Sequence, residues 1–341
     1  MKLTSFGYRA YSFPLGVRSA RGAVGLRRGF HFYVQDAEGR TGWGDAAPWP
    51  GDDQELRLAS AGLANLTGAL FHGTRPAPTP SGIAQFCRAN AITPEAVCAA
   101  ELALLDLLGQ QLGRSVSSLL HAEPSVSVRS HALVDDVRQA ELAVAAGFDT
   151  LKVKVGVADL DDDDARLARI RSAAGPDVRI RIDANGAWAR DQACWAIERL
   201  MRHEIVLVEQ PVQADLITDL GYVRSRVPVD IAADESVTGP VGLRRILAEG
   251  AADVIVLKPM FIGGAAATRE LAELCAAAEV PVYVTHALES AVGRAGAIHI
   301  AASLPGACRG VVCGVCSDVS GGPDVAVPGG AGLGAVPGGA V

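Results

Sequence analysis

The chain has 341 residues, of which 49% are hydrophobic and 20% charged, and its formal net charge is −7. This composition is that of a globular protein with more than one structural unit, and the negative charge argues against a nucleic-acid binder, which would carry a basic face. No apolar run reaches the ~20 residues of a membrane span and the N-terminus lacks the apolar core of a signal peptide, so we expect a cytoplasmic protein.

The N-terminal segment is predicted to form antiparallel strands, including a hairpin with its turn at Asp36–Gly39. Before this hairpin, the stretch Pro14–Gly29 is rich in Gly and Arg and has little periodicity, which predicts a mobile loop. Helices are predicted over 52–70 and 94–112, with a proline-rich connector between them. Residues 1–115 are therefore expected to form an α+β domain.

From about residue 125 the sequence alternates short apolar runs with helical patterns, which is typical of βα units and a parallel sheet. Strands, each followed by a helix, are expected at 126–134, 150–155, 178–185, 204–211, 229–236, 253–259 and 281–287. A last short strand near 309–314 is expected to complete a barrel domain of residues 116–314. The Gly- and Pro-rich tail, 315–341, is expected to run back over the first domain and then fray.

Acidic residues stand at the ends of three consecutive predicted strands. Asp183, Glu209 and Asp234 follow one another at intervals of 26 and 25 residues. Because the carboxyl ends of barrel strands open on one face, these carboxylates should converge. Three carboxylates in one place repel one another unless a cation lies among them, and oxygen ligands of this kind suit magnesium. For any single acid, helix capping or pairing with an arginine is the alternative role.

Lysine is rare in this chain, yet it is concentrated near the predicted acidic face. Only four of the 31 basic residues are lysine, and Lys152, Lys154 and Lys258 lie at strand ends. Lys152 and Lys154 are two apart on one strand and so point the same way, into the barrel, while Lys258 lies on the opposite strand. A lysine can lose its proton, so we expect Lys154 to act as a base whose pKa the metal and Lys152 lower. Ion pairing with the carboxylates is the alternative, above all for Lys152.

Two further patterns are interpreted as structural. The seven cysteines are an odd number without framework spacing, which favours a reduced compartment. Cys313 and Cys316 form a C-x-x-C, but neither further zinc ligands nor the strand-to-helix context of a redox motif accompanies them. The acidic run Asp161–Asp164 lacks the spacing of a calcium loop and is interpreted as the first turn of a helix.

The motifs K-x-K, D-x-N, V-E-Q-P, A-D-E-S and L-K-P resemble those of the muconate-lactonizing-enzyme subgroup of the enolase superfamily. The G-x-G-D-x-x-P hairpin at 42–48 and the tail fit as well, so the resemblance covers nearly the whole chain. It implies an α/β fold, a modified (β/α)7β TIM-type barrel, with an α+β capping domain formed by the N-terminal segment and the extreme C-terminus.

The resemblance also implies a mechanism. Asp183, Glu209 and Asp234 would bind Mg²⁺, or Mn²⁺ in its place, and the metal would hold a substrate carboxylate. Lys154 would abstract the α-proton to give an enediolate. Lys258 would face the other side of the substrate, as a cation or as a second acid/base.

The product of the reaction is not fixed by these motifs. The turn L-E-S-A-V-G-R-A after the seventh strand and the short cap resemble o-succinylbenzoate synthases, the dehydratases of menaquinone biosynthesis, which predicts a lyase. Dipeptide epimerase or N-acylamino acid racemase activity, which would use both lysines, is the alternative, and muconate cycloisomerase activity is third. Dipeptide epimerases carry D-x-D near the last strand, where this chain has Asp318 alone. A non-catalytic binding protein would have lost a ligand or a lysine, and none is missing.

Candidate substrate contacts lie next to these motifs. They are Asn185, Glu235, His286 and Glu289. For His286, packing is an equal alternative, and for Glu289 the alternatives are support of a residue that contacts the substrate and a favourable charge at a helix N-terminus. The segments Pro14–Gly29 and Ala47–Asp53 are predicted to close over the substrate and to set specificity. We expect a small-molecule carboxylate as partner and neither nucleic acid nor membrane, and an even-numbered homo-oligomer is a family expectation.

Overall fold

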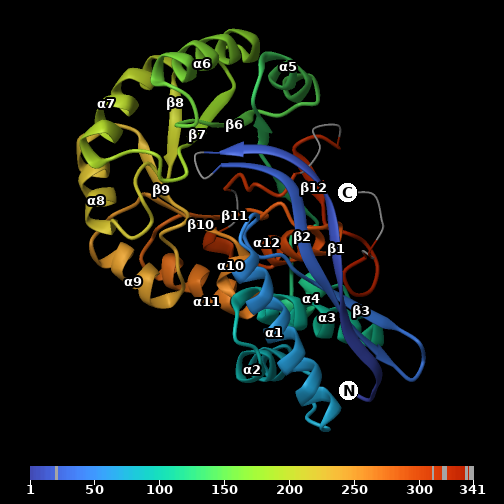
Figure 1. Ribbon diagram of the computed structural model, residues 1–341. Helices are drawn as coiled ribbons and strands as arrows, with labels where there is room; N and C mark the ends of the chain where they lie inside the picture. Colours follow the sequence, from blue (N-terminus) through green and yellow to red (C-terminus); the bar gives the residue numbers. More distant parts are fainter. Residues whose placement is uncertain (20–21, 309–310, 317–320, 335–336, 338–341) are drawn as a thin grey trace.

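The computed structural model describes residues 1–19, 22–308, 311–316, 321–334 and 337. A capping domain of strands and helices lies beside a ring of parallel strands surrounded by helices (Figure 1). The predicted α/β barrel with an α+β cap is thereby confirmed. Among the helices of the described ranges, none is both long and apolar enough to cross a membrane.

The cap is built on a three-stranded antiparallel sheet of β1 (Leu3–Ser19), β2 (Gly22–Asp36) and β3 (Thr41–Ala46). The prediction of a mobile loop over Pro14–Gly29 is wrong for its described residues, because 14–19 belong to β1 and 22–29 to β2, and the two strands pair as one long ribbon. A strand is recognised in a sequence when apolar residues of its buried face alternate with polar residues of its solvent-exposed face. Much of this ribbon is exposed or half-buried, so the alternation is missing from its sequence.

Helix α3 is the centre of the cap. It begins at Pro94, with Thr93 accepting from the Ala96 amide, and ends where Gly113 adopts a left-handed φ of 66°. Strand β3 crosses it at Gly44, where a Cβ would come within 1.8 Å of a carbonyl oxygen of α3. The glycines of the G-x-G-D motif are therefore required by this close crossing. The helices of the cap are α1 (Asp53–Phe71), α2 (Pro80–Asn90), α3 (Pro94–Leu112) and α4 (Val116–Leu120).

The barrel contains seven parallel strands in the order β11-β10-β9-β8-β7-β6-β5. These strands are β5 (Ala132–Val134), β6 (Thr150–Lys154), β7 (Arg179–Asp183), β8 (Ile205–Glu209), β9 (Asp230–Ala233), β10 (Val254–Leu257) and β11 (Val282–Val284). The helices around them are α5 (Val137–Ala145), α6 (Leu160–Ala174), α7 (Arg190–Leu200), α8 (Ile217–Arg226), α9 (Pro240–Ala248), α10 (Pro259–Ile262), α11 (Gly264–Ala277) and α12 (Ala291–Ala302), with 3₁₀ turns at Met201–His203 and Gly306–Cys308. The strands are mostly buried and supply much of the hydrophobic core, as expected of a sheet covered on both faces, although polar and charged residues interrupt β6 and β7.

The barrel closes through very short pairings between β11 and β5. Cys313 bridges Ser130, and Gly314 bridges Thr285, so residues 313–314 join the two edges of the sheet. The predicted strand near 309–314 is therefore shorter than expected, and its residues 309–310 lie outside the described ranges. The predicted first strand is divided: β4 (Ser127–Arg129) pairs instead with β12 (Asp324–Ala326).

The C-terminal segment lies against the cap at Leu333. Its amide donates to Asp106 Oδ1 of α3 at 2.8 Å, and its carbonyl oxygen lies 3.1 Å from His299 Nε2 of α12. Asp318, the acid of the stretch C-G-V-C-S-D-V-S-G-G, and residues 338–341, at the end of the tail that is predicted to fray, lie outside the described ranges. The limits of the domains, 1–115, 116–314 and 315–341, remain predictions.

Candidate active site

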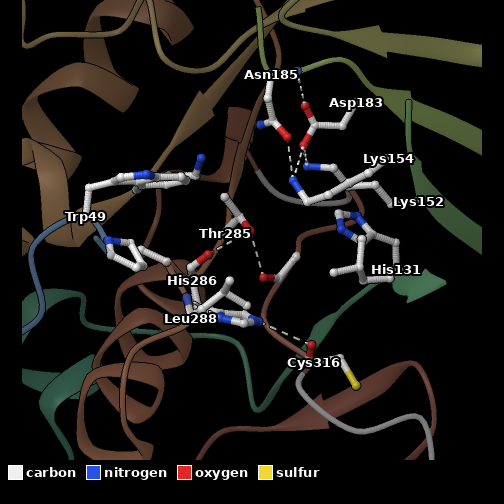
Figure 2. A pocket seen from close by; sticks show the side chains of 15 residues that line it. Trp49, His131, Lys152, Lys154, Asp183, Asn185, Thr285, His286, Leu288 and Cys316 are labelled. Atoms are coloured by element: carbon white, nitrogen blue, oxygen red, sulfur yellow. Dashed lines mark hydrogen bonds and ion pairs between the residues drawn. The ribbon is translucent and has the colours of Figure 1, made fainter. Parts of the chain in front are cut away.

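Two lysines of β6 reach the carboxylates of the neighbouring strands. Lys152 is 7% exposed, and its Nζ lies 2.9 Å from Asp183 Oδ2 and 2.7 Å from Glu209 Oε1. Lys154 donates from Nζ to Asp183 Oδ2 at 3.2 Å and to Asn185 Oδ1 at 2.7 Å (Figure 2). Burial alone would lower the pKa of Lys152, but the charges of Asp183 and Glu209 outweigh it and raise that pKa well above its usual value. Lys152 is therefore an ammonium ion.

The three predicted carboxylates stand at the ends of adjacent strands. Asp183 is the last residue of β7 and Glu209 the last of β8, and the two are register partners. Asp234 directly follows β9, the next strand of the sheet. Their exposed fractions are 1%, 1% and 5%. The parallel register thus aligns three buried strand ends, each with a carboxylate.

The protonation of Asp183 and Glu209 differs because their neighbours differ. Burial would raise the pKa of Asp183, but Lys152 and Lys154 hold it well below the usual value. Glu209 shares Lys152 and also accepts a hydrogen bond from the hydroxyl of Tyr283. Burial, with the charge of Asp183 added, raises the pKa of Glu209 to about 7. Glu209 therefore lies where a second negative charge needs further cationic compensation.

Lys258 supplies the cation on the opposite side of the barrel. It follows β10, forms an ion pair with Asp234, and lies 6.0 Å from the centre of the Trp49 ring. Burial would lower the pKa of Lys258, but the charge of Asp234 raises it above the usual value. Lys154 and Lys258 nevertheless line the same cavity. Two amines from strands far apart in the sheet thus border one space.

The donor set fits magnesium in its chemistry. Three carboxylates supply hard oxygen ligands, and burial together with the charge of Asp183 raises the pKa of Glu209, so a further cation beside it would be favourable. Among the described residues, no three His, Cys, Asp or Glu side chains lie in an arrangement that could hold a metal ion without movement. In this arrangement Lys152 bridges Asp183 and Glu209, and Lys258 is bound to Asp234.

Asn185 and Glu235 lie beside this group. The Asn185 side chain accepts from Lys154 and donates to Glu235 Oε1 at 3.0 Å. Its backbone amide also donates to Asp183 Oδ1 at 3.0 Å, and its φ is +46°, a left-handed value that asparagine tolerates better than most residues. Asn185 therefore links the proposed base to two carboxylates.

His286 and Glu289 are engaged with backbone groups of the turn after β11. His286 Nδ1 accepts from the Leu288 amide at 3.1 Å, so its Nε2 carries the proton and donates to the Cys316 carbonyl at 3.3 Å. Burial lowers the pKa of His286 to about 4, which keeps the ring neutral. Glu289 accepts from the Ala287 amide, and burial raises the pKa of its carboxyl to about 7. His286 lines the cavity with both ring nitrogens in hydrogen bonds to the backbone. Glu289 stabilises the turn through its hydrogen bond from the Ala287 amide.

The cavity is walled by Ala47–Asp53, one of the two segments predicted to close over a substrate. Trp49 of the segment Ala47–Asp53 lies across from the lysines of β6 (Figure 2). Arg27, from the ribbon, is completely buried and donates to the carbonyl oxygens of Ala47 and Leu288 at 2.7 and 2.9 Å. Its guanidinium therefore fastens the cap segment to the turn after β11. That these segments set specificity remains a prediction.

Two residues of α6 hold the chain at the end of β6. Asp163, 1% exposed, accepts from the Gly156 amide at 2.6 Å. Arg166 donates to the Lys154 carbonyl oxygen at 2.5 Å and to Asp163 Oδ1 at 2.7 Å, and also pairs with Asp135. The acidic run thus begins a helix, as predicted, and in addition fixes the backbone that carries Lys154.

Arg166→Ala is expected to lower turnover by about 10–100-fold, because a shift of about 1 Å in a reacting group has effects of this size. Steady-state kinetics would measure the loss, and calorimetry should show unchanged magnesium affinity. Arg169→Ala, which removes an exposed arginine of the same helix, is the matched control and should retain full turnover. Equal turnover in both variants would show that Arg166 does not position Lys154.

Sequence reasoning missed His131 and Tyr283. His131 lines the cavity just before β5, and Tyr283 of β11 is fully buried with its hydroxyl on Glu209. A tyrosine inside an apolar strand is a usable signal, because its hydroxyl needs a buried partner. For His131 no such signal exists, since its direction depends on the interruption between β4 and β5.

The sequence is similar to those of known enzymes. A family model described as enolase C-terminal domain-like matches residues 135–337. The chain is 31% identical over 276 residues to a hydrophobic dipeptide epimerase of Enterococcus faecalis, covering 79% of this chain and 78% of that protein. It is 42% identical over 168 residues to an o-succinylbenzoate synthase of Thermobifida fusca, a match that covers 49% of this chain and 51% of that protein.

The fold is similar to that of solved structures over nearly the full length of the chain. The crystal structure of the dipeptide epimerase from Enterococcus faecalis, complexed with Mg and the dipeptide L-Leu-L-Tyr, superposes with a TM-score of 0.83 at 26% identity. The match covers 98% of this chain and 99% of that one.

Proposed function

The chain belongs to the enolase superfamily of magnesium-dependent enzymes, and from that premise we propose that it removes a proton α to a carboxylate and then eliminates water, as an o-succinylbenzoate synthase does. One observation carries the choice of substrate. Among its described lining residues the cavity holds Lys152, Lys154 and Lys258 but a single carboxylate, Asp183, which is already paired with two of these lysines. Lys152 and Lys258 are also paired with Glu209 and Asp234, so the charge that would favour a substrate with several carboxylates and no free ammonium group is that of the three lysines together with bound Mg²⁺. The product o-succinylbenzoate carries two carboxylates.

Each residue that lines the cavity has a distinct proposed role. Lys154 Nζ is proposed to take the α-proton, with Asn185 and Asp183 fixing its position. Lys258 presents its charge from the opposite side of the cavity, where it stabilises the negative charge that develops on the substrate. Trp49 and the turn after β11 close the cavity and limit the entry of water. Magnesium, held by Asp183, Glu209 and Asp234, would act as a Lewis acid toward the substrate carboxylate.

Epimerisation or racemisation is the second candidate, and a specific observation supports it. Lys154 and Lys258 border the cavity from different strands, as a two-base reaction requires. A dipeptide would bring a free ammonium group to a cavity rich in lysine, whereas an N-acylamino acid would not. Of the isomerases, N-acylamino acid racemase therefore fits the described residues better than dipeptide epimerase. Asp318 lies outside those residues and takes no part in this comparison.

A substrate panel tests the proposal. The magnesium-loaded protein is incubated in deuterium oxide with the dehydration precursor of o-succinylbenzoate, with N-succinyl amino acids and with dipeptides. We expect formation of o-succinylbenzoate, followed by its ultraviolet absorbance, as the fastest reaction. Nuclear magnetic resonance reports α-proton exchange even where no new product forms. Exchange or epimerisation of dipeptides without any dehydration would contradict the proposed function.

A further inference from the structure

Tyr283 of β11 holds one oxygen of the proposed metal ligand Glu209. The tyrosine is fully buried, and its hydroxyl donates a hydrogen bond to Glu209 Oε2. A tyrosine hydroxyl keeps its proton near neutral pH, because its usual pKa is about 10. The other carboxylate oxygen, Oε1, accepts a hydrogen bond from Lys152 Nζ at 2.7 Å. The two oxygens of Glu209 therefore have different partners, one neutral and one charged.

The ring of Tyr283 is held in place by the neighbouring side chains of the barrel interior. Arg181 of β7 lies with its Cζ 5.0 Å from the centre of this ring, and its guanidinium donates to the Val312 carbonyl oxygen at 2.8 Å. Arg181 is 8% exposed, and a cation–ring contact is stronger where water is excluded. His131 meets the same ring edge-on, with 6.2 Å between the ring centres. The hydroxyl of Tyr283 is therefore fixed in position before any ion binds.

The oxygen that Tyr283 does not hold is the one that faces the next carboxylate. The ammonium group of Lys152 lies 2.7 Å from Glu209 Oε1 and 2.9 Å from Asp183 Oδ2, so these two oxygens converge on one positive charge. Glu209 Oε2 is turned toward Tyr283 instead. As long as this hydrogen bond persists, Glu209 offers one oxygen rather than two to a cation beside Asp183.

The number of oxygens that a carboxylate can offer matters differently to Mg²⁺ and to Ca²⁺. Mg²⁺ demands nearly ideal octahedral geometry at about 2.1 Å, whereas Ca²⁺ accepts roughly six to eight oxygens in a flexible arrangement and often binds both oxygens of one carboxylate. A carboxylate that is free to turn can adapt to the larger ion. A carboxylate with one oxygen tied by a hydrogen bond favours the smaller one.

We propose that Tyr283 restricts Glu209 to a single metal-binding oxygen and thereby makes the site selective for Mg²⁺ over Ca²⁺. Tyr283 is a positioning residue, because it acts on the ion through Glu209. The inference rests on the proposed function only in taking Glu209 as a metal ligand. It does not depend on which carboxylate substrate the enzyme uses.

The test measures binding of MgCl₂ and of CaCl₂ to the metal-free full chain by calorimetry. Tyr283→Phe keeps the ring between Arg181 and His131 and removes only the hydroxyl. Because outer partners of metal ligands typically account for about 10–100-fold in affinity, this variant should bind Mg²⁺ at least about tenfold more weakly. Binding of Ca²⁺ should stay the same or become tighter, so the ratio of the two affinities should fall about tenfold.

Tyr222→Phe is the matched control. Tyr222 lies on the outer helix α8, and Arg190 Cζ is 4.5 Å from the centre of its ring, so this variant also removes a hydroxyl from a tyrosine beside an arginine. Both affinities should be unchanged. A purely structural role of Tyr283 would weaken the two ions equally, and an unchanged affinity ratio in Tyr283→Phe would therefore overturn the inference. If Tyr283→Phe does not fold, Tyr283→Met, which also lacks the donor, decides by the same ratio.

Glu209→Gln separates this inference from the proposed function. Weaker Mg²⁺ binding in Glu209→Gln together with an unchanged affinity ratio in Tyr283→Phe would refute the role of Tyr283 alone and leave the metal site in place. Unchanged Mg²⁺ binding in Glu209→Gln would remove Glu209 from the ligand set and overturn the inference with it. A lowered ratio in Tyr283→Phe supports the inference even if the substrate panel shows no dehydration, a result that would refute only the proposed dehydratase.

Discussion

Lys154→Ala is expected to lower turnover by at least about 10³-fold, because general base catalysis is lost. Magnesium binding should persist, since the three carboxylates remain. Lys154 is a better candidate for the base than Lys152, because its side chain is 17% exposed and lines the cavity while that of Lys152 is 8% exposed and bridges two acids. Single-turnover kinetics and calorimetry with magnesium would measure the two effects separately.

The control for this variant is Lys2→Ala, which removes an exposed lysine from the N-terminus and should be silent. The assay also distinguishes the two candidate reactions. In a two-base racemase, Lys154→Ala should still exchange the α-proton of one enantiomer through Lys258, whereas a one-base dehydratase should lose exchange altogether. Wild-type turnover in Lys154→Ala would remove this residue from the mechanism.

The sequence was informative where function depends on the ends of regular strands. Lys154, Asp183 and Glu209 are the last residues of β6, β7 and β8, and Asp234 and Lys258 each follow a strand directly. Short apolar runs separated by helices define these ends, and a parallel sheet then aligns them. Hydrophobic periodicity alone therefore predicts which acids and amines share one face of the barrel.

The contacts across the sheet were not predictable, because they depend on side chains that meet only after folding. Lys152 could point inward by periodicity, but its bridge between Asp183 and Glu209 follows from the register of three strands. Arg27 lay in the stretch assigned to a mobile loop, and its partners are four backbone carbonyls of distant segments. A buried cation whose partners in the described part of the chain are backbone carbonyls leaves no pattern in the sequence.

Asp183→Asn is expected to weaken magnesium binding by more than about 100-fold, because residues that merely support a metal ligand already account for 10–100-fold. Turnover should fall with it. The physical reason is that Asp183 is held ionised by Lys152 and Lys154, so it offers a carboxylate at any pH near neutrality. Calorimetric titration of the metal-free protein measures the affinity directly. Asp191→Asn, an exposed acid of α7, is the matched control.

Glu209 gives the same binding reaction a predictable pH dependence. Its pKa is raised to about 7 by burial and by the charge of Asp183, so below this pH the metal-free protein carries a proton there. Magnesium needs the carboxylate and must displace that proton, so its affinity should fall by up to about tenfold for each pH unit below 7 and level off above it. Titrations in buffers of different ionisation enthalpy would count the released proton. An affinity independent of pH between 6 and 8 in the unmodified protein, or unchanged affinity in Asp183→Asn, would place the metal elsewhere.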